Sequence, residues 1–272
     1  MRYQWPEGYR CAVAVTFDFD AESAFLFREP QKAATSLAGL EERRFGPRVG
    51  VPRILKLMDR YDLKTTFYVP GWVAANHTEA VKSIRDAGHE IGAHGNVHEA
   101  LDHLDPAAEK DVLAESLRLL ETTVGVRPVG YRSPSWELNM GTPTLLKEHG
   151  FLYDSSLMGN DIPYWVDTPK GPLAELPIQW LMDDAPFYRH VYGATNAIAE
   201  PDRVLRMWSQ EFKAMYEENG CFIVTCHPWI SGRASRIAML ETLIQYMRSL
   251  PGVWFTTLEE MARWHVSQQG QV

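Results

Sequence analysis

The strongest constraint on the fold is the regular alternation of strand-like and helix-like segments along the chain. Short apolar runs rich in β-forming residues, such as 11–17 and 222–225, alternate about seven times with amphipathic stretches such as 52–61 and 201–218. This alternation is typical of parallel strands joined by crossover helices. We therefore expect a single α/β domain, residues 1–272, folded as a distorted (β/α) barrel with about seven parallel strands.

An open doubly wound sheet would give the same alternation. Its nucleotide-binding form carries a Gly-x-Gly-x-x-Gly turn or a phosphate loop, and the sequence has neither, so the barrel is preferred. Two segments lack a helical or strand period. Residues 23–50 predict a long loop that covers a pocket, and residues 181–199, which are aromatic and irregular, predict a second loop.

The composition excludes several classes of partner. The net charge is −8 and no run of Lys or Arg occurs, which argues against nucleic acid or an anionic membrane. No apolar segment has the length of a signal sequence core or a membrane span, and the three cysteines suggest reduced thiols, so we expect a cytoplasmic protein. Cys221 and Cys226 could form a zinc pair, but their apolar setting favours a buried strand.

Polar side chains gather where the predicted strands end. In a parallel barrel these ends share one face, on which the active site is built. Each residue has an ordinary structural explanation on its own, such as a surface ion pair, a helix cap or a satisfied core histidine. Together they predict one site formed by Asp18, Asp20, His94, His98, Arg132, Asp154 and His227.

Two pairs within this set point to a cation. His94 and His98 are close enough in sequence to reach one metal ion, and the glycines around His94 favour a loop there over a regular helix. Strand alternation sends Asp18 and Asp20 to the same face, where two buried carboxylates need a metal or an arginine nearby. A surface turn with capping aspartates is the alternative, and the metal is favoured.

Four motifs in this order resemble those of the polysaccharide deacetylase family, over roughly Val13 to Thr257. They are Thr16–Asp20, His94–His98, Arg132-Ser133-Pro134 and Thr225–Pro228. Two departures stand out, because Phe19 separates the two aspartates and Gly95 follows the first histidine where Ser or Thr is common. These variants resemble a subgroup that contains intracellular cyclic-imide hydrolases, allantoinase-like enzymes and an atypical peptidoglycan deacetylase, which are commonly homotetramers.

The resemblance implies roles for the site residues. Asp20, His94 and His98 would bind one divalent ion, first of all Zn²⁺, although Co²⁺, Fe²⁺ and Ni²⁺ accept the same ligands. Asp18 would be the general base, and the two aspartates could exchange these roles. His227 would protonate the departing nitrogen. Arg132 would pair with Asp18 and lower its pKa, and Asp154 would orient His227.

The expected activity is therefore hydrolysis of a carbon–nitrogen bond other than a peptide bond, in a small cyclic imide or ureide or in an N-acetyl sugar. Two rival functions remain at this stage. A serine hydrolase using Ser133 or Ser135 is weak, because no Gly-x-Ser-x-Gly elbow occurs. A barrel that binds a ligand without turnover is the other. The tryptophans that could form the wall of a substrate pocket, or simply pack, are Trp136, Trp165, Trp180 and Trp229.

Overall fold

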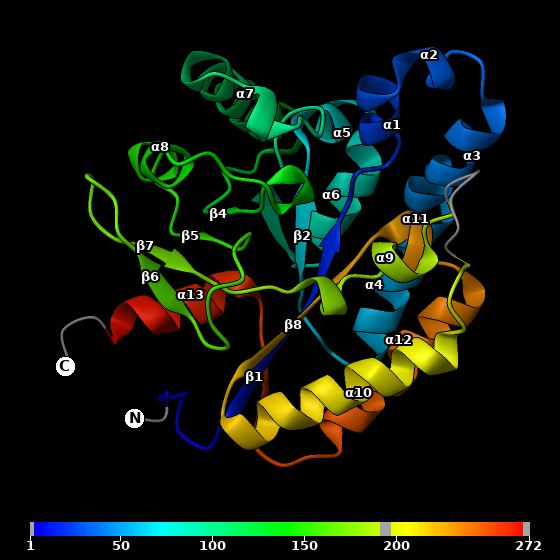
Figure 1. Cartoon of the computed structure of the whole chain (residues 1–272). Helices are drawn as coiled ribbons and strands as arrows, with labels where there is room; N and C mark the ends of the chain where they lie inside the picture. The colour runs from blue at the N-terminus through cyan, green and yellow to red at the C-terminus, as the bar shows by residue number, and fades with distance from the viewer. Residues whose placement is uncertain (1–2, 191–196, 269–272) are drawn as a thin grey trace.

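One mixed sheet carries the fold in the computed structural model, which describes residues 3–190 and 197–268 (Figure 1). The strands, in chain order, are β1 (Cys11–Asp18), β2 (Thr66–Val69), β3 (Glu90–Ala93), β4 (Gly130–Tyr131), β5 (Tyr153–Asp154), β6 (Tyr164–Val166), β7 (Leu173–Glu175), β8 (Cys221–Cys226) and β9 (Val253–Phe255). Their spatial order is β6-β7-β5-β4-β3-β2-β1-β8, and β9 pairs with the first residues of β1. Only the β6–β7 pair is antiparallel among the strands that the structure describes.

The sheet curls into a half-barrel, with β6 at one edge and β8 at the other. An isolated parallel bridge between Asp183 and Thr225 lies against β8, and within the described residues β6 and β8 form no strand pair. The predicted α/β class with a curled, mostly parallel sheet is confirmed. The described chain has nine strands instead of about seven, and the antiparallel β6 was not predicted, because a three-residue edge strand is too short to show a period.

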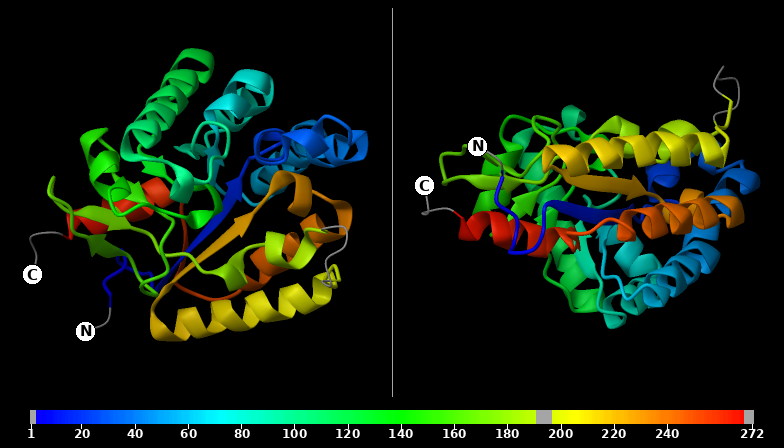
Figure 2. Two further views of the ribbon diagram at one scale, coloured as in Figure 1. Left: turned by 45° about the horizontal axis from the view of Figure 1, so that its top comes forward. Right: turned by 90° about the horizontal axis from the view of Figure 1, so that it is seen from below.

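The crossover helices lie around the sheet (Figures 1 and 2). They include α4 (Val51–Arg60), α5 (Gly71–Asn76), α6 (Thr78–Asp86), α7 (Pro106–Leu119), α8 (Thr142–Glu148), α10 (Pro201–Glu218) and α12 (Ala234–Arg248), and α13 (Leu258–Ser267) follows the last strand. The first turn of α13 lies at the amino-terminal end of the strands, where the backbone N–H groups of Leu258 and Glu259 donate to Thr66 and Glu90. Of the helices described, none combines the length and apolarity needed to cross a bilayer.

Side-chain alternation along β1 places the carboxylates on the inner face of the curl. Val13, Val15 and Phe17 pack in the large core that the outer helices share, whereas Ala12 and Ala14 belong to a smaller inner cluster. Asp18 continues the inner row, as the period of two requires. The small inner side chains of β1 thus lead to an acidic group at its carboxyl-terminal end.

The segment predicted as a long loop is helical, and that prediction was wrong. It forms α1 (Ser23–Arg28), α2 (Pro30–Ala33), α3 (Leu37–Phe45) and a π-helical turn at Gly46–Gly50. No residue of α3 is buried, so it has no apolar stripe for a sequence pattern to reveal. Its amino terminus is stabilised because the Ser36 side chain accepts a hydrogen bond from the N–H of Gly39.

The second predicted loop, residues 181–199, contains one turn of helix, α9 (Ala185–Tyr188), and its residues 191–196 lie outside the described part. Two short helices, α5 and α6, follow β2, and His77 lies between them. The remaining helix α11 (Pro228–Ser231) directly follows β8. It therefore belongs to the loop layer above the strand ends.

Candidate active site

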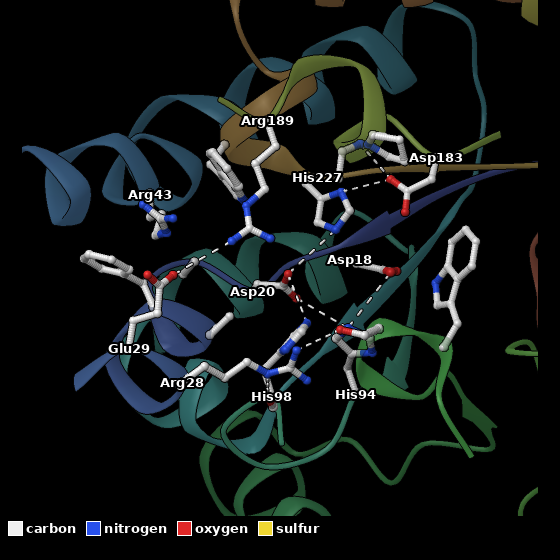
Figure 3. A pocket seen from close by; sticks show the side chains of 18 of the residues that line it. Asp18, Asp20, Arg28, Glu29, Arg43, His94, His98, Asp183, Arg189 and His227 are labelled. Atoms are coloured by element: carbon white, nitrogen blue, oxygen red, sulfur yellow. Dashed lines mark hydrogen bonds and ion pairs between the residues drawn. The ribbon is translucent and has the colours of Figure 1, made fainter. Parts of the chain in front are cut away.

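A cavity of about 390 Å³ opens at the carboxyl-terminal ends of β1, β3 and β8. Figure 3 shows its side chains converging on Asp20 from several segments of the chain. Five of the seven residues predicted for the site line it, and they are Asp18, Asp20, His94, His98 and His227. Arg132 is fully buried beside Asp18, and Asp154 does not line the cavity. Most of the residues predicted from the strand ends therefore lie around one cavity, and their roles stay predictions.

Asp20, His94 and His98 form a group with the spacing of metal ligands. Nε2 of His94 is 3.4 Å from Oδ1 of Asp20, and Nε2 of His98 is 3.4 Å from Oδ2. Two ligands held about 2.0–2.1 Å from one ion in a tetrahedral arrangement are about 3.3–3.4 Å apart. The donor atoms of the three residues lie within 4.8 Å of one another, close enough to surround a single cation.

The surroundings of both imidazoles favour the neutral form that binds a metal ion. Nδ1 of His94 lies 2.7 Å from the backbone carbonyl of Arg132, an arrangement in which Nδ1 carries the proton and Nε2 keeps its lone pair. Burial lowers the pKa of His94, and it lowers the pKa of His98 to about 3. Two unprotonated nitrogens therefore face the Asp20 carboxylate.

Asp20 itself needs a cation in this setting. Burial raises the pKa of Asp20, and Oδ1 is buried without a hydrogen-bond partner among the described residues. An unpaired buried carboxylate is unfavourable, because it has lost water and gained no donor. The orphaned oxygen and the two lone pairs together fit a divalent metal ion.

A strained loop delivers His98 to this group. His98 has a φ of 64°, in the left-handed region that non-glycine residues seldom adopt. Arg28 holds the loop in place by donating from Nε to the carbonyl of His98 and from Nη2 to the carbonyl of Glu99, both at 2.8 Å. The strain is therefore balanced by contacts from α1.

Gly95 explains one departure from the family pattern. Its φ is 66°, and a Cβ there would lie 2.7 Å from Oε2 of Glu99 and 3.0 Å from Cγ of Pro134. The Glu99 carboxylate occupies this space because it accepts hydrogen bonds from the N–H groups of Asn96 and Val97. A Ser or Thr after His94 would require a different loop.

Asp18 forms a buried ion pair with Arg132. Nη1 of Arg132 donates to Oδ1 of Asp18 at 2.9 Å, and both side chains are almost fully buried. Burial alone raises the pKa of Asp18, but Arg132, with His94 and His227, outweighs this and leaves the pKa below its usual value. The other carboxylate oxygen is 4.0 Å from Nε2 of His94, so an ionised carboxylate adjoins the predicted metal position.

Arg132 is held in a fixed orientation by its other donors. Nε donates to the carbonyl of Ser155 at 2.9 Å, Nη2 to the hydroxyl of Ser155 at 3.0 Å, and Nη1 also to Thr16 at 2.8 Å. The guanidinium lies over the ring of Tyr68, 4.3 Å from its centroid. Arg132 is therefore anchored by residues of β1 and β2 and by Ser155 just after β5, and it in turn positions Asp18.

His227 is oriented by Asp184, a residue that the sequence reasoning missed. Its Nδ1 lies 2.7 Å from Oδ1 of Asp184, and its Nε2 lies 3.7 Å from Oδ2 of Asp20. Burial alone lowers the pKa of His227, but Asp184, Asp183 and Asp20 raise it well above the ordinary value. The neighbouring carboxylates thus favour the protonated form of His227, and its Nε2 faces Asp20 at the centre of the site.

Asp154 has a different place from the one predicted. Its Oδ1 accepts from the Ser156 hydroxyl at 2.8 Å, and in β-sheet register it lies beside Glu175, with no bond to His227 among the described contacts. The hypothesis that Asp154 orients His227 is therefore wrong. The sequence signal that could have found Asp184 is the Asp183-Asp184 pair followed by Pro186, which lies in the first turn of α9.

Three of the four tryptophans form part of the pocket wall, and the fourth packs elsewhere. Trp136, Trp180 and Trp229 line the cavity, and the rings of Trp136 and Trp180 stack with centroids 4.2 Å apart. Trp165 instead stacks on His265 with centroids 4.5 Å apart and takes no part in the cavity. Arg28, Arg43 and Arg189, which also line the cavity, were not predicted.

Cys221 and Cys226 are free and buried in β8, as expected of ordinary core residues. Ser133 lies outside the cavity lining, and its hydroxyl donates to the carbonyl of Glu137. Ser135 lines the cavity, but its hydroxyl accepts from Arg28 at 2.9 Å, and no histidine contacts it in the described residues. The serine hydrolase alternative therefore has no activated nucleophile.

Comparisons with known proteins agree with this arrangement. Residues 45–153 match the family described as polysaccharide deacetylase. The chain is 34% identical to a peptidoglycan deacetylase of Helicobacter pylori over 80% of its own length and 84% of that protein.

Two solved structures are similar over nearly the whole chain. A candidate polysaccharide deacetylase from Mycobacterium smegmatis superimposes with a TM-score of 0.95 at 41% identity, over 98% of this chain and 94% of that one. An allantoinase superimposes with a TM-score of 0.86 at 26% identity, with the same two coverages. The relatives thus include proteins named for polymeric and for small substrates.

Proposed function

The chain belongs to the polysaccharide deacetylase family, and from this membership and the site geometry we propose that it is a metal-dependent hydrolase of carbon–nitrogen bonds other than peptide bonds. One observation carries the proposal. Asp20, His94 and His98 have the spacing of metal ligands, and the carboxylate of Asp18 and the imidazole of His227 adjoin them.

Asp20, His94 and His98 would hold one divalent ion, with Zn²⁺ as the first choice and Co²⁺, Fe²⁺ and Ni²⁺ compatible with the same donors. When bound, such an ion acts as a Lewis acid that polarises a carbonyl and makes water more acidic. The carboxylate and the two neutral imidazoles described above are the protein's contribution to this step.

Asp18 and His227 would move the two protons that hydrolysis requires. Asp18, kept ionised by Arg132, accepts the proton of the attacking water. His227 gives its Nε2 proton to the departing nitrogen, since an amide anion is too poor a leaving group. Asp184 keeps Nδ1 of His227 engaged, so that Nε2 is the nitrogen that faces the substrate.

The cavity favours a small substrate. Its volume of about 390 Å³ lies in the lower part of the range of about 300–1,000 Å³ that is usual for small-molecule sites. The stacked pair of Trp136 and Trp180 offers an apolar face against which a flat ring can lie. We therefore place a small cyclic imide or ureide first and an N-acetyl sugar second. Cytoplasmic location and a homotetrameric assembly remain predictions.

Metal analysis of the purified protein, combined with turnover assays on succinimide, allantoin and N-acetylglucosamine oligomers, tests this proposal. We expect about one metal ion per chain, and imide or ureide opening that a chelator abolishes and added Zn²⁺ restores. A protein that takes up metal and binds these compounds without turnover would instead be the ligand-binding barrel. A protein that takes up no metal would refute the proposal.

A further inference from the structure

Three arginines from separate segments line the part of the cavity that the proposed hydrolysis does not use. Arg28 belongs to α1, Arg43 to α3, and Arg189 follows α9. In Figure 3 they surround one open space on the side of Asp20 opposite Asp18, with Glu29 among them. None of them is needed for the proton transfers assigned to Asp18 and His227.

Arg43 is held rigidly in this wall. Its guanidinium carbon lies 4.2 Å from the ring centroid of Phe25 and 5.2 Å from that of Trp229, and only 12% of its side chain is exposed. Nη1 donates to the carbonyl of Gly39 and pairs with Glu42, whereas Nε and Nη2 have no acceptor among the described residues. A largely buried guanidinium with unused donors is favourable when an anion faces it.

Arg189 is the more accessible of the remaining two. Its side chain is 49% exposed, and its nearest carboxylate is Glu29, whose Oε1 is 3.9 Å from Nη2, too far for a hydrogen bond. The other oxygen of Glu29 pairs with Lys32 at 3.1 Å. Arg28, by contrast, uses three donors on the His98 loop and on Ser135 and serves mainly to hold that loop.

Few carboxylates face Arg43 and Arg189. Glu42 pairs with Arg43 and Glu29 is 3.9 Å from Arg189, whereas Glu99 and Asp102 act on Arg28, Asp20 is assigned to the ion and Asp18 is paired with Arg132. The guanidinium groups repel one another in a partly dehydrated space. An anion bound among them would relieve this repulsion.

We propose that the natural substrate carries a carboxylate, which Arg189 and Arg43 bind while the scissile carbonyl lies at Asp20, His94 and His98. The substrate class is then an imide, ureide or amide with an acidic side chain, and this assignment rests on the proposed function. A planar guanidinium matches a carboxylate through two parallel hydrogen bonds. A phosphate offers similar oxygens, but Glu29 would repel its second charge, so the carboxylate is favoured.

Competitive binding of glutarate and pentanoate to the metal-loaded protein tests the proposal directly. Both acids can place one carboxylate at the ion, so their affinity ratio reports the second carboxylate alone. We expect glutarate to bind at least about tenfold more tightly, the effect of one charge-assisted hydrogen bond. A ratio near one would overturn the proposal. Tighter binding of 4-phosphonobutyrate than of glutarate would overturn the choice of carboxylate.

Arginine variants locate the effect. Arg189→Gln and Arg43→Gln should each reduce the glutarate preference by about tenfold, whereas Arg206→Gln, which removes an equal charge from the exposed face of α10, should keep it. A preference that survives both cavity substitutions would refute the assignment. Arg189 is the safer of the two for folding, because half of its side chain is exposed.

Turnover separates this inference from the proposed function. Hydantoin-5-acetate should be opened with a kcat/KM at least about tenfold higher than its methyl ester, and Arg189→Gln should raise KM for the acid more than it changes kcat. Equal turnover of acid and ester without a glutarate preference would refute the carboxylate site and leave the hydrolase intact. A glutarate preference without turnover of any imide, ureide or amide would refute the hydrolase and support the carboxylate site.

Discussion

Nδ1 of His227 lies 2.7 Å from Oδ1 of Asp184, and the backbone N–H of His227 donates to the other oxygen of the same carboxylate at 2.8 Å. The Ser231 hydroxyl donates to that second oxygen as well. One buried carboxylate therefore fixes both the main chain and the ring of the proposed acid. The arrangement explains why the pKa of His227, which burial alone would lower, is instead raised well above its ordinary value.

Asp184→Asn should lower the pKa of His227, because it removes the largest charge that raises it. The proposed acid must be protonated, so activity falls as the pH rises through its pKa. The alkaline limb of the profile of kcat/KM against pH should therefore move to lower pH in this variant. We expect kcat/KM at pH 8 to fall by about 10–100-fold, within the range of one general acid.

Asp154→Asn is the matched control for this substitution. It also neutralises a buried aspartate at a strand end, but Asp154 bonds to Ser156 and adjoins Glu175. The alkaline limb should stay where it is in the parent protein. If the alkaline limb of kcat/KM moved equally in both variants, the loss of a buried negative charge in general, and not the contact with His227, would determine its position.

Substitutions at the ligand group should separate metal binding from proton transfer. His94→Ala and His98→Ala should abolish both metal content and turnover, whereas Asp18→Asn should retain the metal and lose turnover, because Asp18 is already paired with Arg132. Inductively coupled plasma spectrometry with a turnover assay measures both. His103→Ala, at an exposed histidine, serves as the control and should change neither. Loss of metal from Asp18→Asn would reverse the roles of Asp18 and Asp20.

His227→Ala should reduce turnover of an imide or amide by about 10²–10⁴-fold, the usual contribution of one general acid. The reduction should be much smaller for 4-nitrophenyl acetate, because nitrophenolate leaves without protonation. A comparison of the two substrates in the parent and the variant provides the test. Equal losses on both substrates would show that His227 acts on binding or on the metal site and not on the leaving group.

Glu90 should make the stability of the protein depend on pH near neutrality. Burial raises its pKa from 4.5 to about 7, in spite of hydrogen bonds from Thr66, Tyr153 and the N–H of Glu259. Between these values the folded state binds more protons than the unfolded state, so the free energy of unfolding falls as the pH rises from 4.5 to 7. At about 1.4 kcal/mol per pKa unit, the full loss is roughly 3 kcal/mol.

Urea denaturation at pH 4.5 and pH 8 measures this effect. Glu90→Gln stays neutral, so the stability of the parent relative to this variant should fall by a few kcal/mol between the two pH values. Glu218→Gln, at an exposed position of α10, should show no comparable change. A pH-independent difference for Glu90→Gln would contradict the raised pKa.

Gly50 should not tolerate a side chain, because its segment packs directly against the chain that follows His227. A Cβ at Gly50 would clash with the carbonyl oxygen of Pro228 and lie 2.8 Å from its carbonyl carbon. Gly50→Ala should therefore cost about 1–3 kcal/mol of unfolding free energy, as overpacking does, and lower kcat. Gly141→Ala, where nothing lies within 4 Å, should change stability by about 0.5 kcal/mol or less. Thermal unfolding of both variants compares them.

The sequence alone determined the class of the fold and predicted that the candidate metal ligands lie together. An apolar run such as β1 predicts a buried strand because its pattern is local, and its period of two decides that Asp18 and Asp20 share a face. Parallel strands bring their carboxyl ends to the same edge of the sheet, whatever the details of packing. The strand order therefore predicted that His94, His98 and Arg132 lie near Asp18 and Asp20. The sequence did not predict the helices of residues 23–50, because α3 buries no apolar stripe.

Only the tertiary structure decided which carboxylate reaches His227 and which cations enter the cavity. Asp154 and Asp184 both follow or adjoin strand ends, and only the path of the chain through α9 places Asp184 at Nδ1. Arg43 and Arg189 stand in no motif of the sequence, and they line the same cavity although one lies in α3 and the other follows α9. Contacts between segments far apart in the chain depend on the summed packing of the whole core, and no local pattern of residues encodes that sum.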